Sequence, residues 1–299
     1  MIAATGVGVV QSADIMIVTQ TISEARSERE KLGRLALVPT MGALHAGHLS
    51  LIDLARKHAP KVAVSIFVNP TQFGPREDFN KYPRPLEADL AKCRDAGVDL
   101  VFNPLVEQMY PPDGLADVHL DIPSLSSVLE GRIRPSHFKG VCQVVAKLFN
   151  ILRPEVACFG QKDYQQYLVI RAMVEALNWP IEMASGPTVR EPDGLAMGSR
   201  NQYLSAAERE RGLSISRALF AARDEFAKGI RQTNRLLATA QNILLDPGSQ
   251  GRVPLLIDYV AAVDAQTLKD VQVVSSPTLL AVAARVGKTR LIDNVVLIP

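Results

Sequence analysis

Residues 35–55 constrain the fold most, because they join an apolar strand to a helix through a tight turn. Residues 35–38 form an uninterrupted apolar run, as in a buried parallel strand, and residues 49–55 carry apolar side chains at helical spacing. The turn between them, residues 39–48, contains two glycines and two histidines. A buried strand that runs directly into a helix is typical of an α/β fold with a parallel sheet.

This turn has the residues of an anion-binding corner. His45 and His48 lie three residues apart, so both imidazoles face one side of the first helical turn, beside N–H groups that have no partner within the helix. Gly42 and Gly47 allow a ligand to approach the main chain closely. We therefore predict a nucleotide phosphate site. The alternatives are a simple helix cap, and a zinc site that lacks a nearby Cys, Asp or Glu at ligand spacing.

Composition limits the partners and the compartment. The chain has 33 basic and 31 acidic side chains and a net charge of +2, which gives no field strong enough to favour nucleic acid or an anionic membrane. Cys93, Cys142 and Cys158 form no CxxC motif, which fits a reducing, cytoplasmic location. No apolar run approaches the roughly 18 residues of a membrane span, and no basic segment suggests a signal peptide. Residues 1–10, with a Gly-Val-Gly that is a poor dinucleotide motif, are expected to form a loose tail.

Strands and helices alternate through the first two thirds of the chain. Strands are expected at residues 15–18, 35–38, 62–68, 98–102, 118–120 and 156–159. Helices are expected at residues 21–32, 49–55, 85–96, 141–152 and 164–177, the first opened by the capping box Thr21-Ile22-Ser23-Glu24. This alternation predicts a Rossmann-like open parallel sheet with helices on both faces.

The pattern changes from about Ser205. Amphipathic helices are expected at residues 206–228 and 234–245, followed by strands at residues 255–263, 271–274, 279–286 and 291–298. We therefore divide the chain into a Rossmann-like domain, residues 1–186, and a smaller α+β domain, residues 187–299.

Three polar loops are expected at one edge of the parallel sheet. Residues 39–48, 69–74 and 160–166 each follow a predicted strand, and α/β proteins bind ligands at the carboxyl ends of parallel strands. A fourth segment, Arg190 with residues 197–201, carries cations, a hydroxyl and an amide, which suits either a triphosphate or a solvated hairpin. The first three loops are expected to meet in one site.

Five motifs stand out along the chain. They are Thr40-Met41-Gly42-Ala43-Leu44-His45-Ala46-Gly47-His48, Phe67-Val68-Asn69-Pro70-Thr71-Gln72-Phe73, Gly140, Phe159-Gly160-Gln161-Lys162-Asp163-Tyr164-Gln165-Gln166 and Leu195-Ala196-Met197-Gly198-Ser199-Arg200-Asn201. In this order they resemble the pantoate–beta-alanine ligase (pantothenate synthetase) family, over about residues 15–299. The HxGH pattern alone indicates only the wider nucleotidyltransferase superfamily.

The resemblance implies an enzyme that uses ATP to join pantoate to beta-alanine in two steps. The pantoate carboxylate attacks the α-phosphorus of ATP to give pantoyl adenylate and pyrophosphate, and the amine of beta-alanine then displaces AMP. This agrees with elementary chemistry, because a carboxylate must become a mixed anhydride before it condenses with an amine at neutral pH. The resemblance also implies a homodimer, and magnesium held mainly by phosphate oxygens and water, with weak help from Asp163 or Asp89.

The resemblance assigns roles to individual residues. It implies His48 as proton donor, His45 as a phosphate contact and Lys162 as the cation at the α-phosphate. The residues implied to bind ATP are Met41, Gly42, Ala43, Leu44, His45, Ala46, Gly47, His48, Gly160, Gln161, Lys162, Asp163, Val189, and the closing loop Met197, Gly198, Ser199 and Arg200. The residues implied to bind pantoate are Gln72 and Gln166, with Gln72 also reaching beta-alanine. The second-rank contacts are Asn69, Tyr82 and either Arg132 or Arg134.

One position departs from the family pattern. Gly198 stands where the family usually has serine, so one hydroxyl is missing, at a cost to ATP binding of about 0.5–1.5 kcal/mol. Three other interpretations share the HxGH corner: another adenylyltransferase, a fragment of a tRNA-charging enzyme, and a nucleotide-binding module without turnover. The first has no need for Gln72 with Gln166, the second lacks a basic surface, and the third would bind ATP without releasing AMP.

Overall fold

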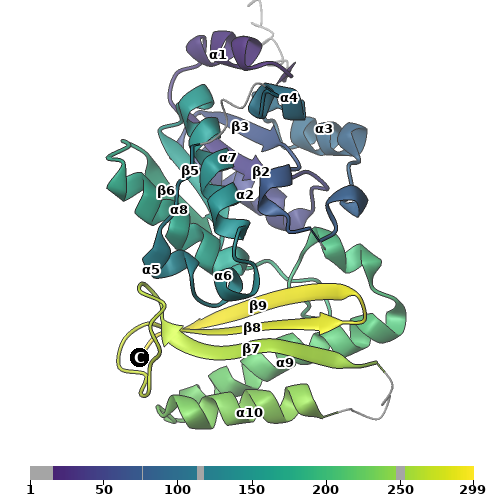
Figure 1. Cartoon of the computed structure of the whole chain (residues 1–299), viewed down its shortest axis with the longest axis vertical. Coiled ribbons are helices and arrows are strands. Elements are labelled where there is room, and N and C mark those ends of the chain that lie inside the picture. The colour runs from purple at the N-terminus through teal and green to yellow at the C-terminus, as the bar shows by residue number, and fades with distance from the viewer. Residues whose placement is uncertain (1–15, 76, 113–117, 247–252) are drawn as a thin grey trace, which may run out of the picture.

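The computed structural model describes residues 16–75, 77–112, 118–246 and 253–299. A six-stranded sheet with helices on both faces lies above a smaller three-stranded sheet, which carries two long helices (Figure 1). The tail expected at residues 1–10 lies outside the described residues.

The larger sheet is parallel throughout, in the order β1-β4-β3-β2-β5-β6. Its strands are β1 (Ile17–Thr19), β2 (Leu35–Thr40), β3 (Lys61–Ile66), β4 (Leu100–Phe102), β5 (Val156–Gly160) and β6 (Glu182–Gly186). The chain proceeds outward from β2 to β4 and then returns to place β5 on the other side of β2. At this switch point Thr40 and Gly160 end neighbouring strands, where sheets of this kind bind ligands.

Helices cover both faces of the parallel sheet. The long ones are α1 (Ile22–Glu30), α2 (Ala46–His58), α3 (Leu86–Asp95), α7 (His137–Leu152) and α8 (Tyr164–Ala176). Leu35 and Leu37 pack in a core with α1, α7 and α8, whereas Ala36 and Val38 pack in a second core with α2 and α3. Because both faces are buried, these strands are apolar at successive positions, and the sequence identifies them for that reason.

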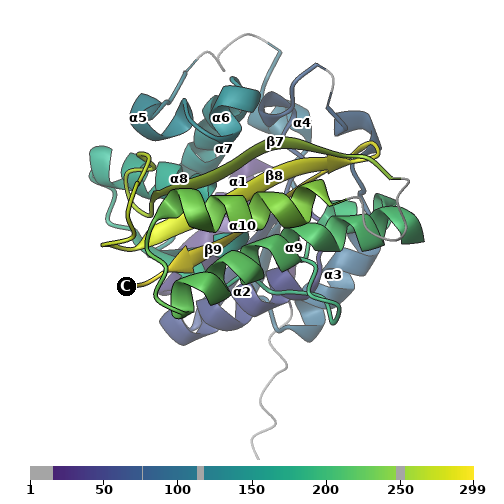
Figure 2. The same cartoon turned by 90° about the horizontal axis from the view of Figure 1, so that it is seen from below.

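The C-terminal part is an antiparallel sheet covered by two helices. Its strands are β7 (Leu255–Asp264), β8 (Thr278–Val286) and β9 (Thr289–Leu297), and its helices are α9 (Ala206–Ala227) and α10 (Thr233–Leu245). Figure 2 shows α9 and α10 lying across one face of this sheet. In β8, Leu280 and Val282 pack with these helices, whereas Leu279 and Ala281 join the core that contains α7 and α8. The small sheet is therefore buried on both faces, and it shares a core with the larger part.

Short helices and turns fill the connections. They are α4 (Val106–Met109), α5 (Pro123–Ser126), α6 (Glu130–Ile133), and the 3-10 turns η1 (Pro70–Gln72), η2 (Phe79–Lys81), η3 (Gln161–Asp163) and η4 (Ser199–Tyr203). The sequence does not predict them, because so few residues carry no periodic signal. None of the helices in the described ranges is long and apolar enough to cross a bilayer.

The predicted fold class is confirmed: an open parallel α/β sheet is joined to a smaller α+β part. The Thr21 capping box is also confirmed, whereas the division between residues 186 and 187 stays a prediction. Two expected strands are wrong. Residues 118–120 are irregular, and in residues 271–274 only Val273 forms an isolated bridge, with Gln232. Strand β6 is an addition, because its sequence is not a continuous apolar run.

Candidate active site

A cavity of about 1400 Å³ lies over the carboxyl ends of β2, β3 and β5. One side is lined by the turn from β2 to α2, by η1 with the residues that follow it, and by η3. The other side is lined by the beginning of α7, residues 187–203 and β9. The three polar loops predicted to share a site therefore meet, and residues 197–201 join them.

Most of the residues given a site role line this cavity. They are Met41, His45, Gly47, His48, Gln72, Gly160, Lys162, Asp163, Gln166, Val189, Met197, Gly198, Ser199 and Arg200, together with the second-rank contacts Asn69, Tyr82 and Arg134. The residues that are not part of the lining are Gly42, Ala43, Leu44, Ala46, Gln161 and Arg132. The Leu44 side chain is buried in the core with α2, and the Gln161 amide turns away to Ser185 Oγ at 3.4 Å. Of the two arginines named as alternatives, Arg134 lines the cavity and Arg132 does not.

A buried carboxylate shapes the turn from β2 to α2. Asp89 of α3 accepts the N–H groups of Ala43 and Leu44, both at 2.7 Å. Gly42 has a φ of +82°, and a Cβ there would lie 3.0 Å from Asp89 Oδ2, so this position needs glycine. Asp89 is 1% exposed, and each of its oxygens accepts one of these N–H groups; the expectation that it assists magnesium stays a prediction.

His45 and His48 stack at the start of α2. Their ring centroids are 4.1 Å apart with 27° between the ring planes. His48 Nδ1 accepts the His45 N–H at 3.3 Å, so the proton of the neutral His48 ring is on Nε2. A Cβ at Gly47 would lie 3.0 Å from the His45 ring, and the stack therefore depends on glycine at this position as well.

Both imidazoles are held in the neutral form. Burial, with the nearby charge of Lys162, lowers the pKa of His45 to about 4, and burial beside His45 lowers the pKa of His48 to about 3. In the part of the chain that the structure describes, Nδ1 of His45 is buried without a hydrogen-bond partner. At neutral pH the rings therefore offer hydrogen bonds rather than charge. His48 can act as an acid only after it has taken up a second proton, which a bound anion favours by raising the pKa of the ring.

Lys162 and Asp163 enter the cavity from η3, directly after β5. The Lys162 ammonium lies 3.8 Å from the Asp163 carboxylate, which makes a loose pair. The backbone carbonyls of Gln161 and Lys162 accept the amide of Asn294, at 3.0 and 2.9 Å. Asn294 lies in β9, so the smaller sheet holds η3 in place. Sequence reasoning missed Asn294, since it follows Gln161 by 133 residues and belongs to none of the five motifs.

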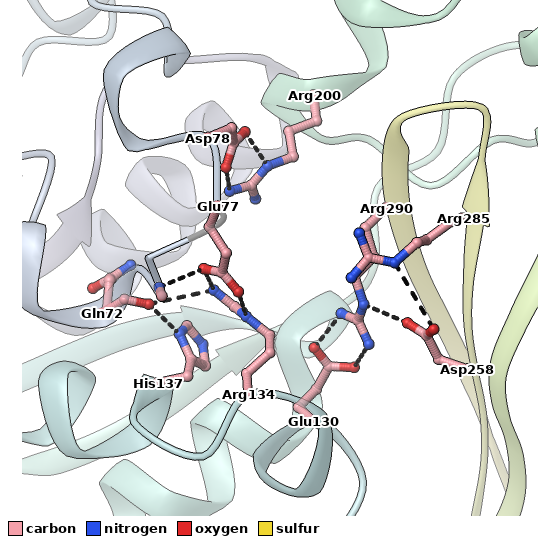
Figure 3. Close-up of polar contacts among 11 residues, drawn as sticks. Gln72, Glu77, Asp78, Glu130, Arg134, His137, Arg200, Asp258, Arg285 and Arg290 are labelled. Atoms are coloured by element: carbon pink, nitrogen blue, oxygen red, sulfur yellow. Dashed lines mark hydrogen bonds and ion pairs between the residues drawn. The ribbon is translucent and has the colours of Figure 1, made fainter.

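The neighbouring carboxylates Glu77 and Asp78 pair with arginines from two different segments (Figure 3). Arg134 donates to Glu77 at 2.6 and 2.7 Å, and Arg200 donates to Asp78 in two bonds of 2.7 Å. Although burial opposes it, these arginines lower the pKa of both carboxyls. Arg200, which was expected to face a triphosphate, is therefore already in an ion pair, and it also lies 5.4 Å from the Tyr82 ring centroid.

A second ion cluster joins the small sheet to α6 at the cavity wall (Figure 3). Arg290 of β9 donates to both carboxylate oxygens of Glu130 in α6, and to Asp258 of β7 at 2.7 Å. The Tyr259 hydroxyl donates to Glu130 at 2.7 Å. The side chains of Arg290 and Glu130 are only 15% and 9% exposed. Sequence reasoning missed this cluster, because each charge looks like an ordinary solvated residue and the partners are far apart in the chain.

Gln72 and Gln166 line the same cavity from η1 and α8. Gln72 Nε2 lies 2.9 Å from Met41 Sδ. The backbone carbonyl of Gln72 accepts a hydrogen bond from His137 Nδ1 at 3.0 Å. The adjacent Gln165 is buried and donates to the Leu125 carbonyl in α5 at 2.7 Å and to the Val128 carbonyl, which follows α5, at 2.8 Å. The two successive glutamines therefore differ: Gln166 is available to a ligand, and Gln165 holds the backbone.

A profile of the family described as pantoate-beta-alanine ligase matches residues 13–296 of this chain. Among curated relatives, the pantothenate synthetase of Thermobifida fusca (strain YX) is 52% identical over 284 residues, which cover 93% of this chain and 95% of the relative. The match therefore extends far beyond the histidine turn.

Two solved structures are similar to this one. A pantothenate synthetase from Thermus thermophilus has a TM-score of 0.89 at 42% identity, covering 95% of this chain and 100% of the other. A pantoate-beta-alanine ligase from Francisella tularensis, complexed with beta-gamma ATP and beta-alanine, has a TM-score of 0.74 at 32% identity, covering 94% and 97%. Similarity of this extent shows an enzyme of the ligase class, and the chain belongs to the pantoate–beta-alanine ligase family.

Proposed function

We propose that this cavity ligates pantoate to beta-alanine in two steps, by way of pantoyl adenylate. The observation that carries the proposal is that the neutral His45–His48 stack, Lys162 and the Gln72 amide face one cavity of about 1400 Å³. One wall offers donors for phosphate oxygens, and another offers an amide for a hydroxy acid. The volume exceeds the roughly 300–1,000 Å³ of a single-ligand pocket, as a site for ATP beside a second substrate requires.

In the first step, the pantoate carboxylate attacks the α-phosphorus of ATP while the bond to pyrophosphate breaks in line with it. Lys162 neutralises charge at the α-phosphate, and His48 Nε2–H donates to the departing pyrophosphate. The approaching polyanion raises the pKa of both histidines, so that His48 can take up a second proton from solvent at Nδ1 and then give its Nε2 proton to the leaving oxygen. The rings are neutral in the ligand-free state, so they bind first as hydrogen-bond donors and become acids only in the loaded site.

In the second step, the amine of beta-alanine attacks the acyl carbon of pantoyl adenylate. The bond between that carbon and the phosphate-linked oxygen breaks, AMP leaves, and the nitrogen loses a proton to become the amide of pantothenate. Gln72 and Gln166 hold the pantoyl group, which presents hydroxyl and carbonyl oxygens to side chains that both donate and accept. Alignment of the amine with the anhydride supplies most of the acceleration in this step.

The segment from Met197 to Arg200 contacts the polyphosphate in this proposal. Ser199 Oγ donates to the Ala43 carbonyl at 3.2 Å, which ties the segment to the histidine turn. Arg200 would exchange Asp78 for phosphate oxygens when ATP enters. Gly198 lies beside Lys162, since a Cβ there would be 3.4 Å from Lys162 Cε.

Magnesium would enter with ATP. No group of three or more His, Cys, Asp or Glu side chains in the described ranges is arranged to hold a metal ion, so phosphate oxygens and water supply most of its ligands. Asp163 lines the cavity and would contact that water shell. We also propose a cytoplasmic homodimer, and a division in which residues 187–299 act as a lid over residues 1–186.

Exchange of labelled pyrophosphate into ATP tests the two-step route. With pantoate and magnesium but no beta-alanine, the chain should catalyse this exchange, because only the adenylate step is reversible without the amine. Lys162→Ala should remove the exchange, and Lys57→Ala, an exposed position on α2, should retain it. Formation of pantothenate without any pantoate-dependent exchange would contradict the adenylate intermediate. ATP binding without exchange or AMP release would instead indicate a nucleotide-binding module.

A further inference from the structure

Asn69 lies in the segment from β3 to η1. Its side chain is held by one backbone group that can only donate and one that can only accept a hydrogen bond. Its Oδ1 accepts the Thr71 N–H at 3.3 Å, and its Nδ2 donates to the Gly140 carbonyl at 3.0 Å. A backbone N–H only donates and a carbonyl only accepts, so the two ends of the Asn69 amide cannot be exchanged. Asn69 is 1% exposed, and these two bonds set which way its amide faces.

The orientation of Asn69 decides that of Gln72. Asn69 Nδ2 also donates to the Gln72 amide at 3.1 Å, and the atom that accepts this bond must be Oε1. The N–H end of Gln72 then points toward Met41 Sδ, at 2.9 Å, and the cavity. A thioether is a weak acceptor, so Gln72 retains donor capacity for a ligand oxygen.

Tyr110 supports this arrangement from outside the cavity lining. Its hydroxyl donates to Asn69 Oδ1 at 2.8 Å, which is shorter than the bonds that the Thr71 hydroxyl and N–H donate to the same oxygen, at 3.0 and 3.3 Å. The Tyr110 hydroxyl also lies 3.3 Å from Thr71 Oγ1. Its ring packs near Phe67, with 6.3 Å between the ring centroids. Burial raises the pKa of Tyr110 to about 12, so the hydroxyl keeps its proton at any working pH.

Helix α7 fixes the main chain of the same segment. A Cβ at Gly140 would lie 2.3 Å from the Thr71 carbonyl oxygen and 2.6 Å from the Gln72 nitrogen, so the helix packs directly against the backbone of η1. His137 Nδ1 donates to the Gln72 carbonyl at 3.0 Å (Figure 3). Both the main chain and the side chain of Gln72 are thus held before a ligand binds.

We propose that Tyr110 is a positioning residue that acts through Asn69 to keep the N–H end of Gln72 toward the substrate. The group that Gln72 recognises is then an acceptor oxygen, a carboxylate or hydroxyl oxygen of the hydroxy acid. With the Gln72 amide reversed, its oxygen would face the substrate oxygen and the two acceptors would repel. This inference rests on the proposed function, in which Gln72 binds pantoate.

Two substitutions test the chain of bonds. Tyr110→Phe removes one hydroxyl and should raise the KM for pantoate about 3- to 10-fold, the worth of about one neutral hydrogen bond. Asn69→Asp removes the donor that orients Gln72 and should raise the same KM by about 30-fold or more. The KM for ATP should change by no more than about twofold in either variant, because neither bond faces the histidine turn. Tyr167→Phe is the matched control: it removes a hydroxyl from α8, outside the cavity lining, and should change neither KM.

A pH profile tests the polarity of Gln72 directly. In Gln72→Glu the new side chain presents only acceptors when ionised, and one O–H donor when protonated. Its KM for pantoate, divided by that of Gln72→Met, should fall as the pH is lowered from about 7.5 to about 5.5. A ratio that does not change with pH would overturn the assigned polarity.

The possible failures are distinguishable. If Gln72→Ala leaves the KM for pantoate unchanged, the assignment of Gln72 to pantoate fails, and the proposed function loses that contact. If Gln72→Ala raises this KM while the folded Tyr110→Phe and Asn69→Asp proteins do not, the positioning role fails and the proposed function stands. A rise of both KM values by the same factor in Tyr110→Phe would also overturn the inference, since it would indicate a general structural role.

Discussion

Two walls of one cavity are built in opposite ways. The histidine turn, residues 39–48, presents neutral rings and a buried nitrogen that has no partner among the described residues. The arginine wall, Arg134 and Arg200, presents cations that two carboxylates already occupy. A phosphate group that enters the turn gains hydrogen bonds, whereas one that reaches Arg200 must displace Asp78. We infer that affinity for ATP comes mainly from the turn and Lys162, and that the arginine wall adds little until an exchange of partners has taken place.

The largest effect is expected for Asp89, which holds the backbone of the histidine turn. Asp89→Ala removes the acceptor of one buried and one partly buried N–H group, so the free energy of unfolding should fall by about 2–4 kcal/mol. Urea unfolding measures this loss, and the KM for ATP should rise with it. Asp53→Ala, at an exposed position of α2, should be nearly neutral. If Asp89→Ala is as stable as Asp53→Ala, the turn does not depend on the buried carboxylate.

The neutral state of the turn has a consequence for stability at low pH. The pKa of His45 is about 4 in the folded chain and near 6.5 when unfolded, so the unfolded state takes up a proton first as the pH falls. The contribution of the neutral His45 ring to the free energy of unfolding is fully present above about pH 6.5 and is lost on acidification toward pH 4. His45→Asn should therefore reduce the loss of unfolding free energy between pH 7 and pH 5 by about 1–2 kcal/mol. The exposed His119→Asn serves as control, and equal pH slopes in wild type and His45→Asn would show that the ring is not held neutral.

Disruption of the Asp78–Arg200 ion pair should change the KM for ATP in the opposite direction, by a smaller factor. Asp78→Asn keeps the size of the side chain and removes its charge, so Arg200 becomes free for phosphate. The KM for ATP should fall about two- to fivefold, at a cost in stability of about 1 kcal/mol or less. Glu210→Gln, which disrupts the exposed pair with Arg217, is the matched control. A KM that rises as far as it does in Arg200→Ala would mean that Asp78 orients Arg200 for ATP instead of competing for it.

Gly198→Ser should have the smallest effect. Gly198 has a φ of −166°, which any residue adopts, and a Cβ would lie 3.4 Å from Lys162 Cε and 3.7 Å from Nζ, at ordinary contact distance. The added hydroxyl would face the phosphate site, so the KM for ATP should stay the same or fall. The gain in binding free energy is at most that of one neutral hydrogen bond, roughly 0.5–1.5 kcal/mol. Steady-state kinetics at saturating pantoate and beta-alanine measure it. A large loss of activity would show that residues 197–200 are not a phosphate loop.

The same contrast explains what could be predicted from the sequence. The parallel strands and the histidine turn depend on neighbours in the chain: apolar residues 62–68 suffice for β3, and two glycines with two histidines suffice for the turn. The family expected from the five motifs is confirmed. Strand β6 escapes notice because Glu182 and Ser185 interrupt its apolar pattern.

The ion pairs of the arginine wall and of the cluster around Arg290 could not be predicted, because they depend on partners that only the fold brings together. Arg200 meets Asp78 across 122 residues of chain, and Arg290 meets Glu130 across 160. Nothing in either local sequence distinguishes a paired arginine from a free one, so Arg200 was expected on a triphosphate. Asp89 illustrates the same limit: it looks like a helix-surface acid, and only the fold places it under the turn.

The most direct test of the account is the formation of AMP from ATP, with pantoate and beta-alanine together and with each omitted in turn, for the wild type and His48→Ala. The account predicts that steady AMP release requires both substrates and falls by about a hundredfold or more in His48→Ala. His119→Ala, at an exposed position, should behave like the wild type. AMP release that does not depend on pantoate, or undiminished release in a folded His48→Ala protein, would contradict ligation at the histidine turn.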